Sequence, residues 1–194
     1  MNESAIKLTL SNLGLLTTYL IPMDHAFFNL YHHGFVRVAV GVPDVRVADP
    51  VFNTSETIQL MKQAAEQHAA LVLFPELGLT AYSCEDLFHQ QALINSSVEA
   101  LQTLLDQSKH INIITVVGLP LQINQLLFNC AVVMYAGRIL GVVPKTYLPN
   151  YREFYELRQF APASVASFDV ISLCQQTDIP FGERLLFSAN NQPV

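Results

Sequence analysis

A buried strand that ends in a carboxylate is predicted at residues 71–76, which read LVLFPE. Four apolar residues in a row, closed by a proline, are typical of a short strand inside an α/β sheet. Glu76 then falls where this strand runs out into a loop. Lys145 follows a second apolar strand in the same way, in residues 139–145, ILGVVPK. Sites in open α/β sheets are built at such strand ends, so Glu76 and Lys145 are the first candidate functional residues.

The two side chains suit hydrolytic chemistry. A carboxylate at the end of a strand is well placed to act as a general base, and a lysine can stabilise an oxyanion. The ordinary interpretation of either residue alone is a solvated loop residue. The pair therefore becomes informative only through its surroundings.

Strands alternate with amphipathic helices around these two segments. Residues 35–42 predict the first strand, a helix capped by Thr54 or Ser55 runs to about Ala70, and a second helix spans about residues 85–108. Both helices have an apolar stripe of the kind that packs in a core. The stripes are Ile58, Met61, Ala65 and His68 in the first helix and Ile94, Val98, Leu101 and Leu105 in the second.

The second half of the chain predicts hairpins. Residues 111–118, 127–136, 138–143 and 168–173 have strand patterns, and Gly137 marks a tight turn. A β-α-β-α-β start followed by hairpins predicts a mixed sheet with helices on one face, whose other face packs on a second sheet. The chain has no repeat and no interdomain linker, so we expect one domain.

Composition narrows the classes of function. Charged residues make up 13% of the 194 residues and hydrophobic residues 51%, which suits buried strands and a surface hidden in a homo-oligomer or against a missing C-terminal part. A net charge of −6 without clustered Lys or Arg argues against a nucleic-acid partner. The longest uncharged stretch, residues 111–137, is broken by Gly, Pro, Asn and Gln, so we expect no membrane helix there.

The cysteines and histidines indicate no disulfide framework and no metal site. The three cysteines form no C-x-x-C pair, which is typical of a reducing, cytoplasmic location. The six histidines have no spacing that resembles a metal site.

Two segments resemble the nitrilase, or carbon-nitrogen hydrolase, superfamily, in which a Glu, a Lys and a Cys form the catalytic triad. They are residues 73–83, LFPELGLTAYS, and residues 142–156, VVPKTYLPNYREFYE. The second is similar more narrowly to the glutaminase domains of glutamine-dependent NAD(+) synthetases, because Tyr147 stands where general nitrilases tend to carry a histidine. The resemblance includes the first strand and the hairpin at residues 128–133, and spans about residues 23–187.

The resemblance implies an α/β fold of the nitrilase type, an α-β-β-α sandwich that is incomplete at its C-terminus. Glu76 would be the general base and Lys145 the oxyanion-stabilising lysine. The family's nucleophilic cysteine sits in an element like E-I-C-E-D, which follows a segment like residues 181–187, FGERLLF. The chain ends at Val194, just short of that element, so we interpret it as a fragment that lacks the nucleophile.

Two further residues gain roles from the resemblance. Tyr151 matches a tyrosine that contacts the substrate glutamine. Glu156 matches a second glutamate near nitrilase triads, and an equally open interpretation is an ion pair with Arg152 or Arg158. Both residues are therefore predicted to line the substrate site.

The cysteines of the chain are not expected to replace the missing nucleophile. Residues 84–86, Cys-Glu-Asp, look like part of the family's nucleophile element, but Cys84 lies only eight residues after Glu76, where the family has a variable residue. Cys130 alternates with apolar neighbours in a strand and Cys174 ends one, so both are predicted core residues.

The implied parent protein hydrolyses L-glutamine and passes ammonia to the ATP-dependent amidation of deamido-NAD. ATP and deamido-NAD would bind a missing C-terminal synthetase domain, because no Ser-Gly-Gly-x-Asp-Ser phosphate loop occurs here, and this fragment would hold no cofactor. Two alternatives stay open. One is a stand-alone amidase or nitrilase that acts on a small amide, and the other is a non-catalytic remnant that binds a partner subunit.

The chain is expected to divide near Met23. Lys7 and the uncharged residues 8–23 superficially resemble a signal peptide but lack a small-x-small cleavage site. We interpret residues 1–22 as an N-terminal extension that comes from an over-extended gene start. Residues 23–194 are the predicted N-terminal part of the hydrolase domain.

Overall fold

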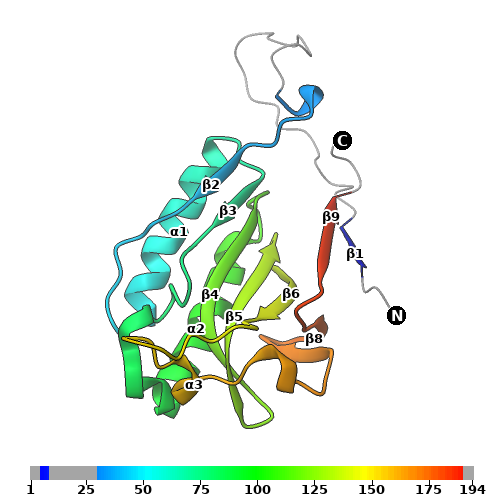
Figure 1. Cartoon of the computed structure of the whole chain (residues 1–194). Coiled ribbons are helices and arrows are strands. Elements are labelled where there is room, and N and C mark those ends of the chain that lie inside the picture. The colour runs from blue at the N-terminus through cyan, green and yellow to red at the C-terminus, as the bar shows by residue number, and fades with distance from the viewer. Residues whose placement is uncertain (1–4, 9–29, 190–194) are drawn as a thin grey trace.

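A five-stranded mixed sheet forms the centre of the computed structural model, which describes residues 5–8 and 30–189 (Figure 1). The strands lie in the order β2-β3-β4-β5-β6. They are β2 (Val38–Val40), β3 (Leu71–Leu73), β4 (Ile114–Ile123), β5 (Leu126–Tyr135) and β6 (Arg138–Pro144). Strands β2, β3 and β4 run parallel to one another, and β5 is antiparallel to both of its neighbours, β4 and β6. This arrangement confirms the predicted mixed sheet.

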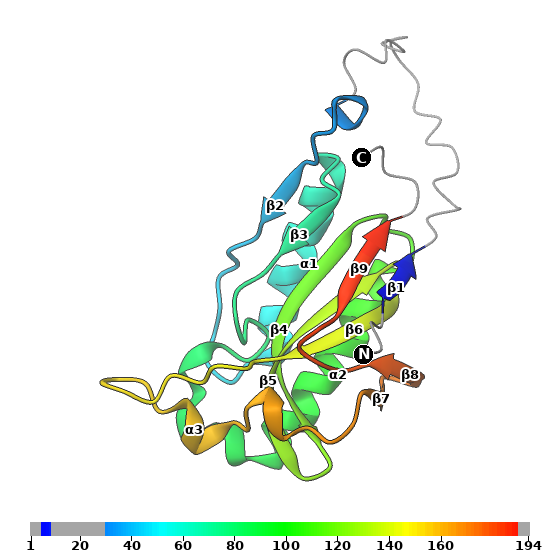
Figure 2. The same ribbon diagram turned by 45° about the vertical axis from the view of Figure 1, so that its right-hand side comes forward.

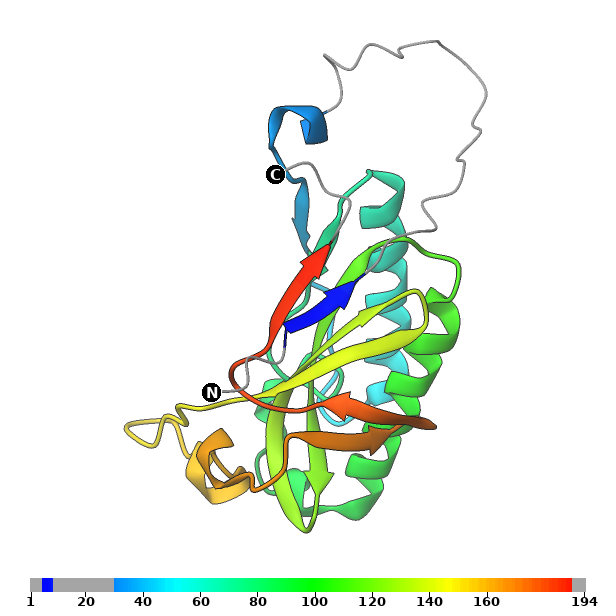
Figure 3. The same ribbon diagram turned by 90° about the vertical axis from the view of Figure 1, so that its right-hand side faces the viewer.

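Two helices, α1 (Pro50–Glu66) and α2 (Gln91–Ser108), cover one face of this sheet (Figures 1 and 3). Met61 of α1 and Leu101 of α2 are fully buried in the main core, with Val72, Val117 and Val132 from the strands. The predicted stripe of α2 is confirmed, because Ile94, Leu101 and Leu105 are buried and Val98 packs against the main core.

The opposite face of the sheet is apolar and partly open. Val38 and Val40 of β2 are 61% and 72% exposed, and Leu73 of β3 is 44% exposed. Ala39 lies between the two valines and packs against the helix-covered core. Side chains alternate along a strand, so Val38 and Val40 belong to the face that the helices do not cover.

The first helix begins earlier than predicted. Thr54 and Ser55 lie inside α1, so the prediction that either of them caps the helix is wrong. Asp49 is the N-cap, and its carboxylate accepts a hydrogen bond from the N–H of Phe52 at 3.1 Å. Pro50 at the first helical position is pre-organised for a helix start and lacks the N–H that would be left unpaired there.

The second helix begins later than predicted. Residues Tyr82–His89 form the kinked 3₁₀ segment η3, and α2 starts only at Gln91. Ala81 and Glu85 have positive φ values of 69° and 47°, and such backbone cannot continue an α-helix. The prediction missed this break because no Gly or Pro marks it.

The long hairpin of β4 and β5 also extends beyond the prediction. Strand β4 continues through Pro120 to Ile123, and the chain reverses at Asn124 and Gln125, both with positive φ. The turn between β5 and β6 was predicted at Gly137, and it is confirmed at Ala136 and Gly137, which also have positive φ.

Smaller elements lie around the main sheet (Figure 2). They are η2 (Leu30–His33), α3 (Glu156–Gln159), η4 (Ala163–Val165), the β7 (Val170–Leu173) and β8 (Gln176–Pro180) hairpin, and the parallel pair β1 (Ala5–Leu8) and β9 (Leu186–Ala189). Strands β1 and β9 lie on the side of the main sheet opposite the helices (Figure 3). Apart from β1, the predicted extension of residues 1–22 lies outside the described residues.

Candidate active site

Three charged side chains that are far apart in the sequence meet at one end of the sheet. The Nζ of Lys145 lies 2.7 Å from Oε1 of Glu76 and 2.9 Å from Oε1 of Glu156. Glu76 comes shortly after β3, Lys145 directly after β6, and Glu156 is the first residue of α3. Strand ends thus bring together Glu76, the predicted general base, and Lys145, the predicted oxyanion-stabilising lysine. The start of a short helix adds the third charge.

The two glutamates keep Lys145 positively charged. Partial burial lowers the pKa of its ammonium group, but the hydrogen bonds and charges of Glu76 and Glu156 outweigh this effect and raise the pKa above its ordinary value. A lysine that stays charged, and that is held from two sides, can stabilise a negative charge that develops beside it.

Glu156 is the most buried member of the group, with only 4% of the residue exposed. Its Oε1 accepts hydrogen bonds from Lys145 and from the hydroxyl of Tyr82 at 2.7 Å, while its Oε2 is buried without a hydrogen-bond partner among the described residues. Burial raises the pKa of Tyr82, and the hydrogen bond to Glu156 and the negative charges of Glu156 and Glu76 raise it further. The Tyr82 hydroxyl therefore stays a neutral donor.

The alternative ion pair predicted for Glu156 is not formed. Arg158 instead binds Asp86 through a two-pronged contact, at 2.8 Å and 3.0 Å. This contact joins α3 to η3, the segment that carries Tyr82. The rings of Phe88 and Phe160, 5.0 Å apart, pack between the same two elements.

Asn129 is a site residue that sequence reasoning missed. It lies on β5 and is only 3% exposed, its side-chain Nδ2 donates to Oε1 of Glu76, and its carbonyl accepts from the N–H of Lys145 at 2.8 Å. The signal that could have found it is a single asparagine in the apolar run FNCAVV, because asparagine is disfavoured in strands.

The backbone that carries Glu76 is packed directly on the sheet. A Cβ at Gly118 of β4 would lie 2.8 Å from the carbonyl oxygen of Pro75 and 3.0 Å from the carbonyl carbon of Glu76. The N–H of Leu79 also donates to the carbonyl of Gly118 at 3.1 Å. Only a glycine at this position lets the loop approach so closely.

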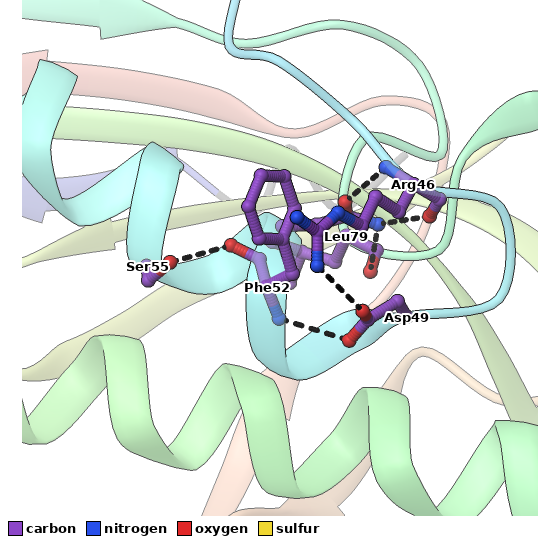
Figure 4. Close-up of polar contacts among 6 residues, drawn as sticks. Arg46, Asp49, Phe52, Ser55 and Leu79 are labelled. Carbon is purple, nitrogen blue, oxygen red and sulfur yellow. Dashed lines mark hydrogen bonds and ion pairs between the residues drawn. The ribbon is translucent and has the colours of Figure 1, made fainter.

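The same loop is tied to the start of α1 (Figure 4). Buried Asn53 donates from Nδ2 to the carbonyl of Leu79 at 3.2 Å and to that of Arg46 at 2.9 Å, and it accepts from the N–H of Arg46 at 2.7 Å. The guanidinium of Arg46 stacks on the ring of Phe52, 3.7 Å from its centroid. These contacts anchor the loop that follows Glu76 to the start of α1.

Tyr151, the predicted substrate-contacting tyrosine, is not joined to the charged group. It is 63% exposed, and its ring contacts that of Phe154 at 5.8 Å between centroids. No hydrogen bond links it to Glu76, Lys145 or Glu156 in the part of the chain that the structure describes.

The cysteines of the described chain are poorly placed for nucleophilic chemistry. Cys84 is 2% exposed, and its thiol points at the carbonyl of Thr80, 3.0 Å away. Burial raises the pKa of Cys84 and of Cys130, and it raises the pKa of Cys174 to about 11. Cys130 lies in the main core, which confirms its prediction as a core residue, whereas Cys174 is only partly buried and packs at the border of that core.

A cavity of about 480 Å³ opens beside the charged group. Its lining includes Glu156, which contacts Lys145, and Tyr82, which contacts Glu156. Its other polar lining residues are Ser83, Glu85, Asp86, Glu153, Tyr155, Arg158 and Gln159. Within residues 5–8 and 30–189, no group of three His, Cys, Asp or Glu is placed to hold a metal ion. None of the described helices is long and apolar enough to cross a membrane.

Sequence comparison connects this geometry to known proteins. Residues 37–179 match the family described as Carbon-nitrogen hydrolase. The chain is 40% identical over 167 residues to the glutamine-dependent NAD(+) synthetase of Mycobacterium tuberculosis H37Rv, and 38% identical over 165 residues to that of Mycobacterium leprae. These alignments cover 86% and 84% of this chain but only 24% of each relative.

Solved structures have the same fold. A glutamine-dependent NAD(+) synthetase from Cytophaga hutchinsonii matches with a TM-score of 0.68 and 24% identity, over 76% of this chain and 25% of that one. The synthetase from Acinetobacter baumannii matches with a TM-score of 0.57 and 30% identity, over 71% and 26%. An amidase from Nesterenkonia sp. matches with a TM-score of 0.54 and 22% identity, over 73% and 52%. The predicted nitrilase-type fold is thereby confirmed.

Proposed function

The chain belongs to the carbon-nitrogen hydrolase family, and we propose that it is part of a glutamine amidohydrolase domain that supplies ammonia for the ATP-dependent amidation of deamido-NAD. The observation that carries this proposal is Lys145 held between Glu76 and Glu156, in a chain 40% identical to a mycobacterial glutamine-dependent NAD(+) synthetase. The chain spans about a quarter of that relative's length, so the other steps of NAD synthesis belong to sequence outside it.

In the proposed reaction a cysteine thiolate attacks the side-chain amide carbonyl of glutamine. Glu76 takes the proton of the thiol and later gives it to the departing nitrogen, so that the C–N bond breaks as ammonia leaves. Lys145 stabilises the oxyanion of the tetrahedral intermediate. Glu76 then activates a water molecule that hydrolyses the thioester and releases glutamate.

The nucleophile of this reaction is proposed to lie outside the 194 residues. Cys84 and Cys130 are buried, and Cys174 is partly buried against the main core. Among the described residues, the thiols of Cys84 and Cys174 contact backbone carbonyls, and neither contacts Glu76 or Lys145. The pKa of each thiol is raised, whereas a catalytic cysteine needs a lowered one. We therefore expect the chain by itself to be inactive.

The remaining parts of the proposal follow from the same assignment. L-glutamine is the substrate, and Tyr151 and Glu156 belong to the wall of its site. ATP and deamido-NAD bind a C-terminal synthetase domain, and this chain itself holds no cofactor. The full protein is a cytoplasmic homo-oligomer.

Ammonia release from glutamine tests the proposal. The 194-residue chain should release none above background, and the chain joined to the sequence that follows it in its gene should release ammonia. Glu76→Gln in the extended protein should abolish this release, because the amide cannot take a proton from the thiol. Ammonia release by the extended protein from other small amides but not from glutamine would contradict the proposal.

A glutamine-like electrophile gives an independent measurement on the same protein. Peptide mapping by mass spectrometry should find the adduct on a cysteine outside the 194 residues and none on Cys84. An adduct on Cys84 would show that the nucleophile lies within this chain, so the assignment of an absent nucleophile would be wrong.

A further inference from the structure

Asn129 contacts both candidate catalytic residues at once. Its main-chain carbonyl accepts from the N–H of Lys145 at 2.8 Å, and its side-chain Nδ2 donates to Oε1 of Glu76. The residue is 3% exposed and sits within the long hairpin, where its strand is paired on both sides. One residue in a rigid strand thus sets the positions of the lysine backbone and of the glutamate side chain relative to each other.

The two donors converge on the same oxygen of Glu76. Lys145 Nζ lies 2.7 Å from Oε1, and Asn129 Nδ2 donates to the same atom. An ionised carboxylate oxygen has about two lone-pair sites, so these two contacts occupy Oε1. Oε2 of Glu76 accepts no hydrogen bond from the described residues, and the Glu76 side chain is 43% exposed.

We propose that Asn129 is a positioning residue that, together with Lys145, holds Oε1 of Glu76 and thereby makes Oε2 the oxygen that exchanges the proton in catalysis. This inference rests on the proposed function and assigns a residue and an atom that the triad alone does not. Lysine is a mobile point donor and cannot by itself fix the rotation of a carboxylate. The amide of Asn129 adds a second, fixed donor and introduces no charge.

The electrostatics favour this orientation of the amide. With the amide turned over, its Oδ1 would face Oε1 of Glu76, and two acceptors would meet. The carboxylate therefore selects Nδ2 as the atom that faces it, and the amide in turn selects Oε1. The pair keeps a defined geometry before any substrate arrives, which is the condition for efficient proton transfer.

Two variants of the extended protein test the assignment by kinetics. Asn129→Leu has a similar volume but no donor, and we expect kcat for glutamine hydrolysis to fall about 10- to 100-fold. KM should change by less than about threefold, because the contact acts on the proton transfer and not on substrate binding. Asn129→Asp keeps the shape but places a second carboxylate against Glu76, so its kcat should fall further than that of Asn129→Leu.

Thr115→Val is the matched control. Thr115 is buried on the neighbouring strand β4, and its hydroxyl has no hydrogen-bond partner among the described residues. The variant should retain wild-type kcat. If Asn129→Leu also retains wild-type kcat, or if Thr115→Val loses as much as Asn129→Leu, the positioning role is wrong.

An NMR measurement on the 194-residue chain does not depend on the reaction. In the ¹⁵N-labelled chain, one side-chain amide proton of Asn129 should resonate downfield and exchange slowly with solvent. The shift should disappear in Glu76→Ala and persist in Thr115→Val. If the extended protein releases no ammonia from glutamine but the shift is present, the proposed function fails and the positioning contact stands. Absence of the shift in the unmodified chain overturns the inference.

Discussion

The two loops that meet at Lys145 are built differently. Every residue from 77 to 81, in the loop that follows Glu76, is buried, whereas none from 146 to 155 is, and this second loop projects from the body of the protein (Figures 2 and 3). Three tyrosines of the projecting loop stand in solvent, Tyr147 with 87% and Tyr151 and Tyr155 with 63% of their surface exposed. The fold therefore packs the loop that follows Glu76, the proposed general base, into the protein, and leaves the loop proposed to contact substrate largely exposed.

This contrast predicts that one loop serves the proposed chemistry and the other the proposed substrate binding. Glu76 is held by Asn129, and its loop is packed against Gly118, so changes there should affect stability and reaction together. Changes in the projecting loop should affect substrate binding alone, because exposed side chains contribute little to folding. The predictions below test this separation.

Removing the positive charge of Lys145 should have the largest effect on stability and on kcat. Lys145→Met keeps the apolar stem but leaves buried Glu156 without its positive partner, so unfolding in urea should show a loss of roughly 3 kcal/mol. In the extended protein, kcat should fall about 10²- to 10³-fold. Adding Glu156→Gln should restore stability but not kcat. Wild-type stability of the single variant would show that Glu156 does not depend on Lys145.

Adding a side chain at Gly118, against which the loop that follows Glu76 packs, should have the next largest effect. Gly118→Ala forces a Cβ against Pro75, Glu76 and Leu77, and we expect a loss of about 1–3 kcal/mol in urea unfolding, with a lower kcat. Gly182→Ala is the control, since nothing lies within 4 Å of a Cβ there. Equal free energies of unfolding and equal kcat in the two variants would mean that the loop that follows Glu76 can shift away from Gly118 at little cost.

Truncating an exposed tyrosine should leave folding unchanged. Tyr151→Ala should alter the free energy of unfolding by less than about 0.5 kcal/mol, because the side chain is 63% exposed. In the extended protein it should raise KM for glutamine, which steady-state kinetics would detect. Tyr155→Ala, at the same exposure, is the comparison variant. An unchanged KM in Tyr151→Ala would remove Tyr151 from the substrate site.

Removal of residues 1–22 should have the smallest effect on the site. This segment contains β1, which pairs only with β9 among the described strands. Thermal unfolding of the chain with and without the segment should differ by less than ~2 kcal/mol. A larger loss would mean that β1 belongs to the core, and the predicted boundary near Met23 would be wrong.

Local signals explain which parts of this arrangement the sequence predicts. Apolar runs that end at Glu76 and Lys145 are short-range patterns, and strand ends converge by the geometry of the sheet. Asn129 and Tyr82 reach the site through contacts 53 and 74 residues apart in sequence, which no local pattern records. Pro120 obscured the length of β4, because proline usually ends a strand prediction.

The helix boundaries also depend on whether a local sequence signal marks them. Asp49 followed by Pro50 is a stronger start signal than Thr54, since it combines a capping side chain with a residue suited to the first helical position. The kink at Ala81 and Glu85 carries no such signal, because tertiary packing of η3 imposes positive φ on residues that do not prefer it.

The open apolar strand at the edge of the main sheet has a practical consequence for all of these measurements. Among the described residues, β2 is an edge strand of the main sheet, and its valines Val38 and Val40 are exposed. An apolar edge strand of this kind can pair with the same strand of another copy. Such self-association would raise the apparent melting temperature with protein concentration and hide a destabilising change. Measurements at two concentrations reveal it, and Val40→Lys, a charge on the outward face of the edge, should suppress it.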